Sequence, residues 1–414
     1  MNVYILGGLR TPIAVANTKF KNIRPEIFGA EVLKALRKRF NLNRVDEIIC
    51  GNAVGTGGNL ARLMTLLAGF DESTPALTVD RQCASGAAAV SVAFAKISAG
   101  LADVIIAGGA ESSSLQPLKI YNKNDDRFNL TAADNIQGAY KTAQFSPEEL
   151  DPLAMLKGAQ RVAEAENISK AELDAWVFIS HQRANDAKDI LKNFIVPING
   201  ICADNGIKNI TAKLLERAPR PLGETSVISA ANACRINDGA AFVVLAGEDF
   251  IRENNLTPAA QIIDVATLGI NPLESPRGAQ AVADKLLARN NLSYKDLNAI
   301  EFNEAFAVID VLFQRAHPNL SGIYNPLGGA LAYGHPYGAS GAILLIHLLA
   351  SLKNGLGLIS IAGAGGTGDA VLIKSFAKVS PQERLFLVAK LHNIAKKNRP
   401  DRLSGLNFIN PLSI

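Results

Sequence analysis

The sequence is poor in the residues that mark several classes of protein. It has four cysteines and one tryptophan among 414 residues, and aromatic side chains make up 6% of it. The cysteines, at positions 50, 83, 202 and 234, follow no metal-ligand spacing and are too few for a disulfide framework in a chain of this length. We therefore expect no metal site and reduced thiols, one of which is available for catalysis.

Long apolar runs and blocks of charge are also absent. No uninterrupted apolar stretch approaches the roughly 20 residues of a membrane span, and neither end carries a recognisable secretory or address signal. The net charge is only +4, with no prominent Lys/Arg block. We therefore expect a cytoplasmic protein with neither a membrane nor a nucleic-acid partner. A mildly positive charge is compatible with a small anionic substrate.

What the sequence does contain is an alternation of apolar strand-like runs and Ala/Leu-rich helical stretches. Buried strands are predicted within residues 45–54, 102–111, 239–248, 297–306 and 357–366. This alternation predicts an α/β fold with largely buried sheets.

An internal repeat is the main architectural signal. Ala84-Ser85-Gly86 matches Ala339-Ser340-Gly341 at an offset of 255, and residues 106–108 match residues 361–363 at the same offset. Two related α/β halves about a pseudo-twofold axis explain this pattern. The helices that follow each Ala-Ser-Gly are apolar on every side, which predicts that they lie between two sheets.

The repeat suggests a division of the chain. We expect an N-terminal half formed by residues 1–114 and 230–256, and a C-terminal half formed by residues 257–379. Residues 115–229 are richer in Asn, Lys, Asp and Pro and are interpreted as an inserted loop domain. Residues 380–414 form a C-terminal extension, in which a basic amphipathic helix is expected to dock on the body.

Cys83 is the first candidate for chemistry. It lies where a predicted strand gives way to an apolar helix. The positive end of the helix dipole and the unpaired N–H groups at that place favour the thiolate and so nucleophilicity. An isolated cysteine is often a small buried apolar residue instead, but the Gly-containing turn and the duplicated position favour the nucleophile.

Two further loops supply polar candidates. His335 lies in a glycine-rich loop that enters the second repeat helix, so it should face Cys83, take the thiol proton and donate to an oxyanion. His347, inside that helix, is interpreted as a buried structural residue. Asn303 and Glu304 follow a strand, at the sheet end where active sites gather. Asn303 could hold a water, and Glu304 could be either a base or a structural acceptor.

Together these elements resemble the thiolase superfamily over about residues 1–376. The matching motifs are RTP at 10–12, CASG at 83–86, GGAES at 108–112, NDGAA at 237–241, NEAF at 303–306 and GHPYGASGA at 334–342. The resemblance implies a five-layer α/β/α/β/α fold of two duplicated halves with an inserted loop domain, assembled as a homodimer or homotetramer. It also implies coenzyme A thioesters as substrates, no bound cofactor and a place in lipid metabolism.

The resemblance also assigns roles by position. Cys83 resembles the acyl-accepting nucleophile, His335 its activator, and Asn303 the holder of a water that completes an oxyanion hole with His335. The backbone N–H groups of Cys83 and Ala364 resemble a second oxyanion hole. The residues implied in binding coenzyme A or the acyl group are Met155, Asn232, Cys234, Ala305 and Phe306.

Two departures from the family pattern stand out. Ala362 occupies the position of a second, proton-moving cysteine, and a positioned general base contributes typically about 10²–10⁴-fold to a rate. The segment 199–210 is shorter than usual and lacks an arginine near the nucleotide, so that Lys208 is the expected substitute.

Three functions remain open at this point. The first is a thiolase-type acyl-CoA C-acyltransferase, acting as an acetyl-CoA acetyltransferase or a 3-ketoacyl-CoA thiolase with an altered acid/base. The second is an acyltransferase or thioesterase whose acceptor needs no α-proton removal. The third is a non-catalytic acyl-CoA-binding subunit, which the retained Cys83, His335 and Asn303 argue against.

Overall fold

Two sets of elements repeat one another in the computed structural model, which describes residues 1–55, 57–147 and 151–376. The first set consists of β1 (Val3–Arg10), α1 (Pro25–Arg39), β3 (Glu47–Gly51), α2 (Leu60–Leu67), β4 (Ala76–Val79), α3 (Ser85–Ser98), β5 (Val104–Ser112) and β10 (Asn237–Gly247). The second consists of β11 (Ala260–Gly269), α9 (Gly278–Arg289), β12 (Ala299–Phe302), α10 (Ala307–Ala316), α12 (Tyr337–Ser351), β13 (Gly355–Gly363) and β14 (Thr367–Ser375).

The strands of the two halves are arranged in the same order. The first half runs β1-β10-β5-β3-β4 and the second runs β11-β14-β13-β12, with Tyr324 bridging Ile300 where a fifth strand would lie. In both halves the strand that follows the central helix pairs in parallel with an earlier strand, β5 with β3 and β13 with β12. The predicted duplication is therefore present. A short antiparallel pairing of β1 with β11 joins the halves into one ten-stranded sheet, which includes β2 (Ala14–Val15).

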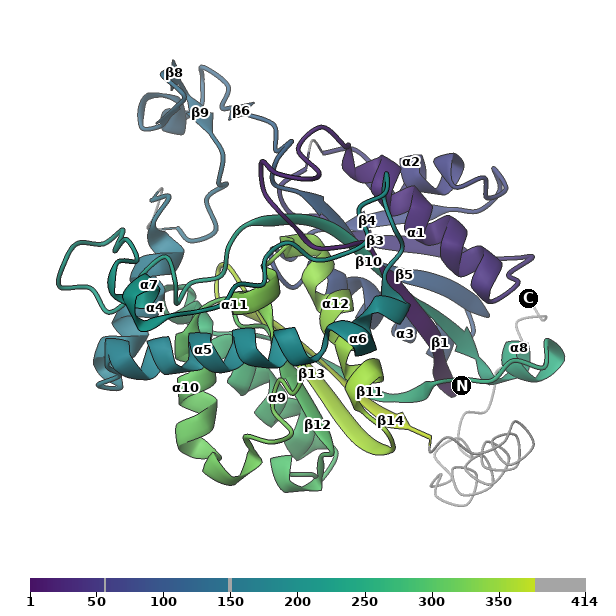
Figure 1. Ribbon diagram of the computed structural model, residues 1–414. Coiled ribbons are helices and arrows are strands. Elements are labelled where there is room, and N and C mark those ends of the chain that lie inside the picture. The colour runs from purple at the N-terminus through teal and green to yellow at the C-terminus, as the bar shows by residue number, and fades with distance from the viewer. Residues whose placement is uncertain (56, 148–150, 377–414) are drawn as a thin grey trace, which may run out of the picture.

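Helices form three layers that alternate with the two halves of this sheet (Figure 1). Helices α1 and α2 cover one outer face, and α9 and α10 cover the other. Helices α3 and α12 lie between the two halves and contact strands of both. The five-layer α/β arrangement implied by the family resemblance is thus confirmed, and the position of α3 and α12 between the two halves explains their apolar surfaces.

The two central helices touch backbone to backbone. A Cβ built on Gly341 would lie 2.2 Å from the Ala87 nitrogen, and one built on Gly86 would lie 2.7 Å from the Gly338 carbonyl oxygen. Only glycine permits such an approach, because any side chain would collide with the opposite helix. The glycines of the repeated Ala-Ser-Gly motif therefore set the distance between the halves at the starts of both helices.

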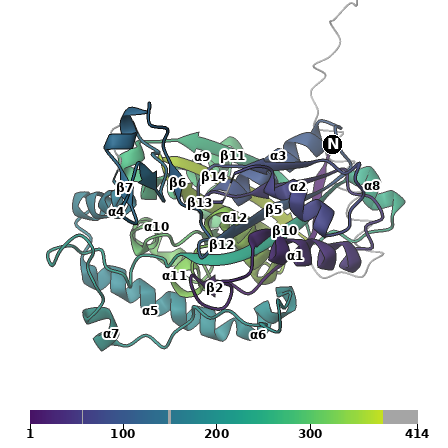
Figure 2. The ribbon, with the colours of Figure 1, turned by 90° about the horizontal axis from the view of Figure 1, so that it is seen from above.

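The segment between β5 and β10 adds two further parts. One is a small unit of short strands, β6 (Lys119–Ile120), β7 (Ala132–Ala133), β8 (Ile136–Gln137) and β9 (Ala139–Tyr140), with the 3-10 turn η1 (Asp126–Asn129). Figure 1 shows this β6–β9 unit projecting from the body. The other contains α4 (Ala154–Ala165), α5 (Lys170–Asp186), α6 (Lys188–Leu191), η2 (Lys192–Phe194) and α7 (Ala212–Glu216). Figure 2 shows α5 and α6 along one side of the molecule, opposite α9.

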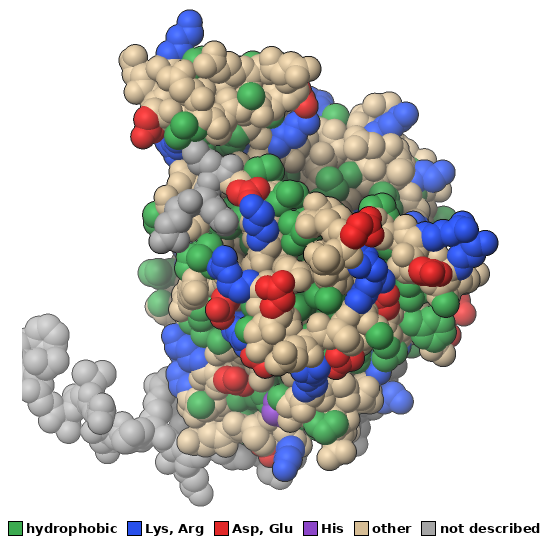
Figure 3. All heavy atoms as spheres, turned by 90° about the vertical axis from the view of Figure 1, so that its left-hand side faces the viewer, with side chains coloured by type: hydrophobic (Ala, Val, Ile, Leu, Met, Phe, Trp, Pro, Cys, Tyr) green, Lys and Arg blue, Asp and Glu red, His purple; other side chains and the backbone are tan. Residues whose placement is uncertain are grey.

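The remaining elements are short connections. They are α8 (Glu248–Glu253), η3 (Pro272–Arg277), η4 (Tyr294–Asp296), η5 (Pro318–Leu320) and α11 (Ala330–Tyr333). The basic helix predicted beyond residue 380 lies outside the described residues. In the described ranges, none of the helices has the length and apolar character needed to cross a bilayer. On the face shown in Figure 3, acidic and basic side chains are interspersed rather than gathered into a surface of one sign.

Candidate active site

Cys83 and His335 both lie just before the starts of the two central helices. Cys83 stands two residues before α3, and His335 stands two residues before α12. The first turns of these helices are in contact, because the Gly338 carbonyl oxygen lies against Gly86. The structure therefore places both residues at one junction between the halves, as the repeat predicted.

The loop that carries Cys83 is held in a tight conformation. Ser85 accepts a hydrogen bond from the Arg81 N–H at 2.8 Å and donates one to the Gln82 carbonyl at 2.6 Å. Gln82 has a φ of 51°, a left-handed conformation that non-glycine residues rarely adopt. The loop is thus fixed by its own hydrogen bonds before any substrate is present.

Burial dominates the chemistry of the Cys83 thiol. It raises the pKa from 9.0 to about 12, although backbone N–H groups of Ala364 and of Cys83 itself act in the opposite direction. Backbone N–H groups at the helix start favour the thiolate as expected, but desolvation outweighs them because it penalises the charged form more strongly. The resting thiol is protonated and needs a base.

Ala364 lies in the turn between β13 and β14. Gly365 and Gly366 have φ values of 80° and 74°, which a side chain would strain. The turn is anchored by hydrogen bonds from the Gly366 N–H to Ser275 Oγ at 3.1 Å and from the Ile270 N–H to the Gly366 carbonyl at 2.7 Å. This anchoring leaves the Ala364 N–H close to the Cys83 sulfur.

Ala362 brings no titratable group to this turn. Its methyl group belongs to the apolar cluster on the α9 side of the sheet, and a Cβ built on Gly278 would lie 3.6 Å from it. The residue itself is almost fully buried. The structure therefore agrees with the sequence that the β13–β14 turn offers backbone groups but no acid or base at position 362.

The His335 ring is set up as a neutral proton acceptor. Its Nδ1 lies 2.6 Å from Ser340 Oγ, and its Nε2 lies 3.4 Å from Asn303 Nδ2. An amide nitrogen only donates, so we assign the ring proton to Nδ1, which donates to Ser340, and the lone pair to Nε2, which accepts from Asn303. Burial lowers the pKa of His335 to about 3, which keeps the ring neutral.

The backbone of His335 is fixed by the NDGAA segment. Its N–H donates to the Arg235 carbonyl at 2.9 Å and lies 3.1 Å from Asn237 Oδ1. Gly334 has a φ of 103°, and a Cβ there would lie 1.9 Å from Asn237 Oδ1. The glycine before the histidine is thus required for Asn237 to reach it.

The surroundings of Glu304 decide between the two roles that the sequence leaves open for it. Its carboxylate is fully buried and accepts from Trp176 at 3.1 Å, Ser180 at 2.6 Å, Asn325 at 3.0 Å and the Leu331 N–H at 3.2 Å. Burial raises its pKa. A carboxylate held by four donors joins α5, α11 and β12, so Glu304 is the structural acceptor.

The two segments expected to contact substrate lie side by side. The Cys234 N–H donates to the Ala305 carbonyl at 2.9 Å, and Phe306 forms a bridge with Ala233. Asn232 is fully buried, and its amide accepts from the Ser229 N–H and donates to the Val227 carbonyl and to Asp174 on α5.

Tyr337 connects this region with the two catalytic candidates. Its ring lies 5.1 Å from the His335 ring. Burial raises its pKa, and negative charge on Cys234 or Cys83 would raise it further. Met155 is partly buried in the first turn of α4 and packs against the core cluster beside α9 and α10.

A cationic cavity opens beside this group. It has a volume of about 450 Å³, and it contains Lys208, Arg217, Arg235 and His181 among apolar side chains. Burial and the neighbouring cations Arg235 and Lys208 lower the pKa of His181 to about 4. The sequence indicated Lys208 as the only cation here. The structure adds two arginines, because the loop after α7 folds back onto residues 230–235.

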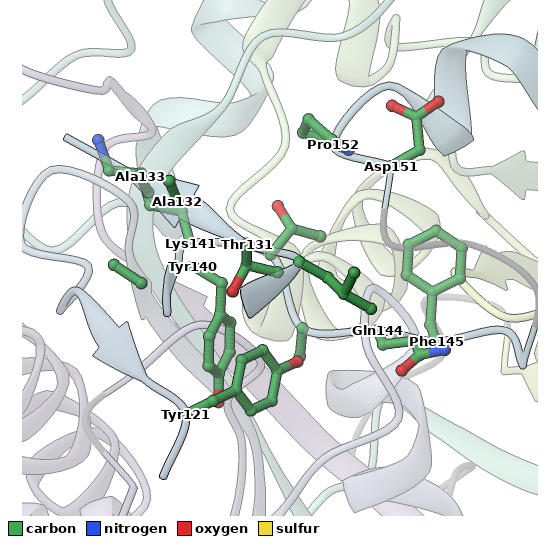
Figure 4. Close-up of a pocket in the computed structure, with 14 residues that line it drawn as sticks. Tyr121, Thr131, Ala132, Ala133, Tyr140, Lys141, Gln144, Phe145, Asp151 and Pro152 are labelled. Atoms are coloured by element: carbon green, nitrogen blue, oxygen red, sulfur yellow. The ribbon is translucent and has the colours of Figure 1, made fainter. Parts of the chain in front are cut away.

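A second cavity, of about 360 Å³, lies in the β6–β9 unit (Figure 4). The rings of Tyr121 and Tyr140 stack at 4.2 Å on one wall, and Phe145 and Asp151 line another part. Phe145 also touches the β13–β14 turn, since its carbonyl oxygen would lie 2.9 Å from a Cβ on Gly365. The cavity lining includes none of the catalytic candidates.

Sequence reasoning missed several residues that organise the site. Ser340 orients His335, and Glu111 accepts hydrogen bonds from Asn52 and from the Gly338 N–H at the start of α12. Arg81 pairs with Asp369 across the two halves. Ser340 had a usable signal, because it is the repeat partner of Ser85. The other contacts join residues far apart in the chain and had none.

Comparison with known proteins agrees with this geometry. The thiolase N-terminal domain matches residues 3–249, and the thiolase C-terminal domain matches residues 256–375. "Putative acetyl-CoA C-acetyltransferase VraB" of Staphylococcus aureus (strain COL) is 34% identical over 386 residues, which cover 90% of this chain and 99% of that protein. "Putative acetyl-CoA C-acetyltransferase YhfS" of Bacillus subtilis (strain 168) is 34% identical over 387 residues, covering 91% and 100%.

Solved structures give the same result. The Acat5 thiolase of Ascaris suum in complex with coenzyme A has a TM-score of 0.83 and 28% identity, covering 91% of this chain and 100% of that one. The Bacillus anthracis acetyl-CoA acetyltransferase has the same score and identity, covering 91% and 99%. With two duplicated halves, paired helix starts and both family domains in place, the chain is an acyltransferase that belongs to the thiolase family.

Proposed function

We propose that the chain is a thiolase-type acyl-CoA C-acyltransferase, an acetyl-CoA acetyltransferase or a 3-ketoacyl-CoA thiolase, that works through an acyl-Cys83 intermediate. The observation that carries the proposal is that a partly buried, protonated thiol and a neutral histidine with an unprotonated Nε2 lie just before the two central helices, whose first turns are in contact. In such a pair the proton moves from the thiol to the histidine as the sulfur attacks a substrate carbonyl.

The first half-reaction follows from these groups. The Cys83 sulfur attacks the thioester carbonyl carbon while its proton passes to His335 Nε2. The negative charge that develops on the carbonyl oxygen is received by the N–H groups of Cys83 and Ala364. When the carbonyl re-forms, the bond to the coenzyme A sulfur breaks, and that sulfur takes the proton from His335. Asn303, whose amide lies beside His335 Nε2, holds the water that completes the other oxyanion hole together with His335.

The cationic cavity supports a coenzyme A thioester as substrate. Lys208, Arg217 and Arg235 supply positive charge, and Val177, Ile210 and Leu214 supply apolar surface. This combination suits a nucleotide that carries phosphate groups. Coenzyme A is bound in the similar Ascaris suum thiolase.

Ala362 favours a second candidate, an acyltransferase or thioesterase whose acceptor needs no α-proton removal. Carbon–carbon bond formation requires a base for the α-proton of the donor, and position 362 offers only a methyl group. Water or an already activated carbon would accept the acyl group without that base. The two candidates share acyl-Cys83 and differ in the second half-reaction.

Intact-mass detection after incubation with a panel of acyl-CoA thioesters tests the shared step. We expect a mass increase equal to the acyl group less one hydrogen in the parent chain and in Cys234→Ala, and none in Cys83→Ala. The Cys234→Ala variant is the matched control, since it removes the neighbouring thiol. An unlabelled parent chain, under conditions that label another thiolase, would overturn the proposal.

Restoring the second thiol separates the two candidates. Ala362→Cys should raise acetoacetyl-CoA thiolysis by up to about 10²–10⁴-fold if the base at this position is the missing part. Ala362→Ser, of nearly the same size but without an acidic thiol, is the control and should leave the rate low. Equal rates in all three chains would show that position 362 does not limit the reaction.

A further inference from the structure

One buried charge near the active site has no part in the reaction described above. Asp369 lies in β14, opposite Ile361 in β13, and its side chain is completely buried. Its Oδ1 accepts a hydrogen bond from Arg81 Nη1 at 2.7 Å, whereas Oδ2 has no partner among the described residues. Burying a carboxylate that has only one charged hydrogen bond costs free energy of folding. A role other than stability would account for its presence here.

The partner of this carboxylate, Arg81, belongs to the loop that carries Cys83. Arg81 lies two residues before Cys83, and its backbone N–H and carbonyl take part in the hydrogen bonds that close the loop onto Ser85 and Ala84. The guanidinium remains about one-third exposed. Fixing Arg81 therefore fixes the loop on the side away from the helix, where Gln82 holds its left-handed backbone.

The same loop packs directly on the β13–β14 turn that contains Ala364. A Cβ built on Gly363 would lie 3.0 Å from the Arg81 carbonyl oxygen and 3.6 Å from the Ala84 Cβ. Ala364, whose N–H lies by the Cys83 sulfur, is the next residue. The ion pair therefore connects the loop that carries Cys83, through Arg81, with β14, the strand that follows the β13–β14 turn.

Stability does not explain the pair. Burial raises the pKa of Asp369 from 3.8 to about 6 even though Arg81 acts to lower it. Because the folded-state pKa is the higher one, this carboxyl favours the folded state at low pH and loses that contribution as the pH rises from about 4 to about 6. At pH 7 the charged form is therefore a cost to folding.

We propose that the Arg81–Asp369 ion pair is a positioning device that holds the Cys83 loop in register with the Ala364 turn, so that the N–H groups of both meet the same oxyanion. The inference rests on the proposed function. Each half contributes one N–H group, and the pair is the charged link between the two segments that carry them. Neither residue touches the substrate, so both act through Cys83 and Ala364.

Two reactions of the same sulfur distinguish positioning from a general structural role. Acylation of Cys83 by acetyl-CoA develops an oxyanion and needs both N–H groups. Alkylation of Cys83 by iodoacetamide displaces iodide at a saturated carbon and develops no oxyanion. Asp369→Asn should lower the acylation rate constant by roughly 10²-fold, the loss typical of a small misplacement, while alkylation changes little and the melting temperature at pH 7 does not fall.

Further variants complete the test. Arg81→Gln should match Asp369→Asn, the double variant should be no slower than either single one, and Arg81→Lys should retain part of the rate. Asp264→Asn, which breaks the Arg289–Asp264 pair at the surface, is the matched control and should leave acylation unchanged. Normal acylation in Asp369→Asn, or equal losses in acylation and alkylation, would overturn the inference. Absence of acyl-Cys83 in the parent chain would overturn the proposed function and this inference with it.

Discussion

At the scale of single residues, desolvation controls both partners of the proposed proton transfer. Burial raises the pKa of Cys83 and lowers the pKa of His335. Both shifts favour the uncharged thiol and imidazole over the thiolate–imidazolium pair. The site therefore resembles a serine hydrolase more than a cysteine protease in its resting state, since the proton moves during the attack and not before it.

This state predicts an unusual pH dependence for Cys83 alkylation. With a pKa near 12, the rate of iodoacetamide alkylation should rise about tenfold per pH unit from pH 7 to pH 10 without a plateau. The same chain unfolded in urea should level off near the ordinary cysteine pKa of about 8.5. The measurement is peptide mass spectrometry of the Cys83 fragment, and a plateau below pH 9 in the folded chain would contradict the assignment.

Ser340 should control which nitrogen of His335 carries the proton. Ser340→Ala removes the partner of Nδ1, so the ring can place its proton on Nε2 and lose its acceptor. We expect acylation of Cys83 to slow by roughly 10²-fold, less than the loss seen when a triad carboxylate is replaced. Ser351→Ala, at the other end of α12, is the control. Equal rates in both variants would mean that Ser340 does not orient the ring.

At the scale of elements, the sequence was sufficient where a pattern is repeated and insufficient where burial decides. The 255-residue offset predicted that α3 and α12 correspond, and their apolar surfaces predicted the central layer. It could not reveal that Glu304 is held by four donors, because those come from α5, α11 and Asn325. Motif spacing locates residues along the chain, whereas solvation depends on everything packed around them.

The contact between the central helices makes a sharp test at this scale. Gly341→Ala would drive a methyl group into Ala87, so the helices must separate or bend, at a cost of about 1–3 kcal/mol in the free energy of unfolding. Gly322→Ala is the matched control, because a Cβ there meets no atom within 4 Å. Urea denaturation measures both, and equal stability of the two variants would exclude the close crossing.

At the scale of the whole molecule, the free sheet edge bears on assembly. Among the described residues β4 pairs only with β3, so its other edge is unoccupied. The adjacent α2 exposes 46% of Leu63, 43% of Leu66 and 41% of Leu67. An open edge beside exposed leucines favours association of two chains. The homo-oligomer expected from the family resemblance is therefore proposed to form here.

Charges placed on α2 should test this assembly. Leu63→Asp combined with Leu67→Asp should convert the oligomer to a monomer in light scattering, since burying two carboxylates at an interface is unfavourable. Leu101→Asp changes a leucine that is 75% exposed elsewhere, and it should leave the assembly intact. A parent chain that is already monomeric, or a double variant that remains associated, would contradict the proposed surface.

The central helix layer has a consequence for how the molecule folds. Because α3 and α12 complete one apolar core that belongs to both sheets, neither half can bury its inner face alone. The chain should accordingly lose its structure in one calorimetric transition rather than in two steps. By the same reasoning, a single copy of the repeat should be stable only as a symmetric pair, in which each copy covers the inner face of the other.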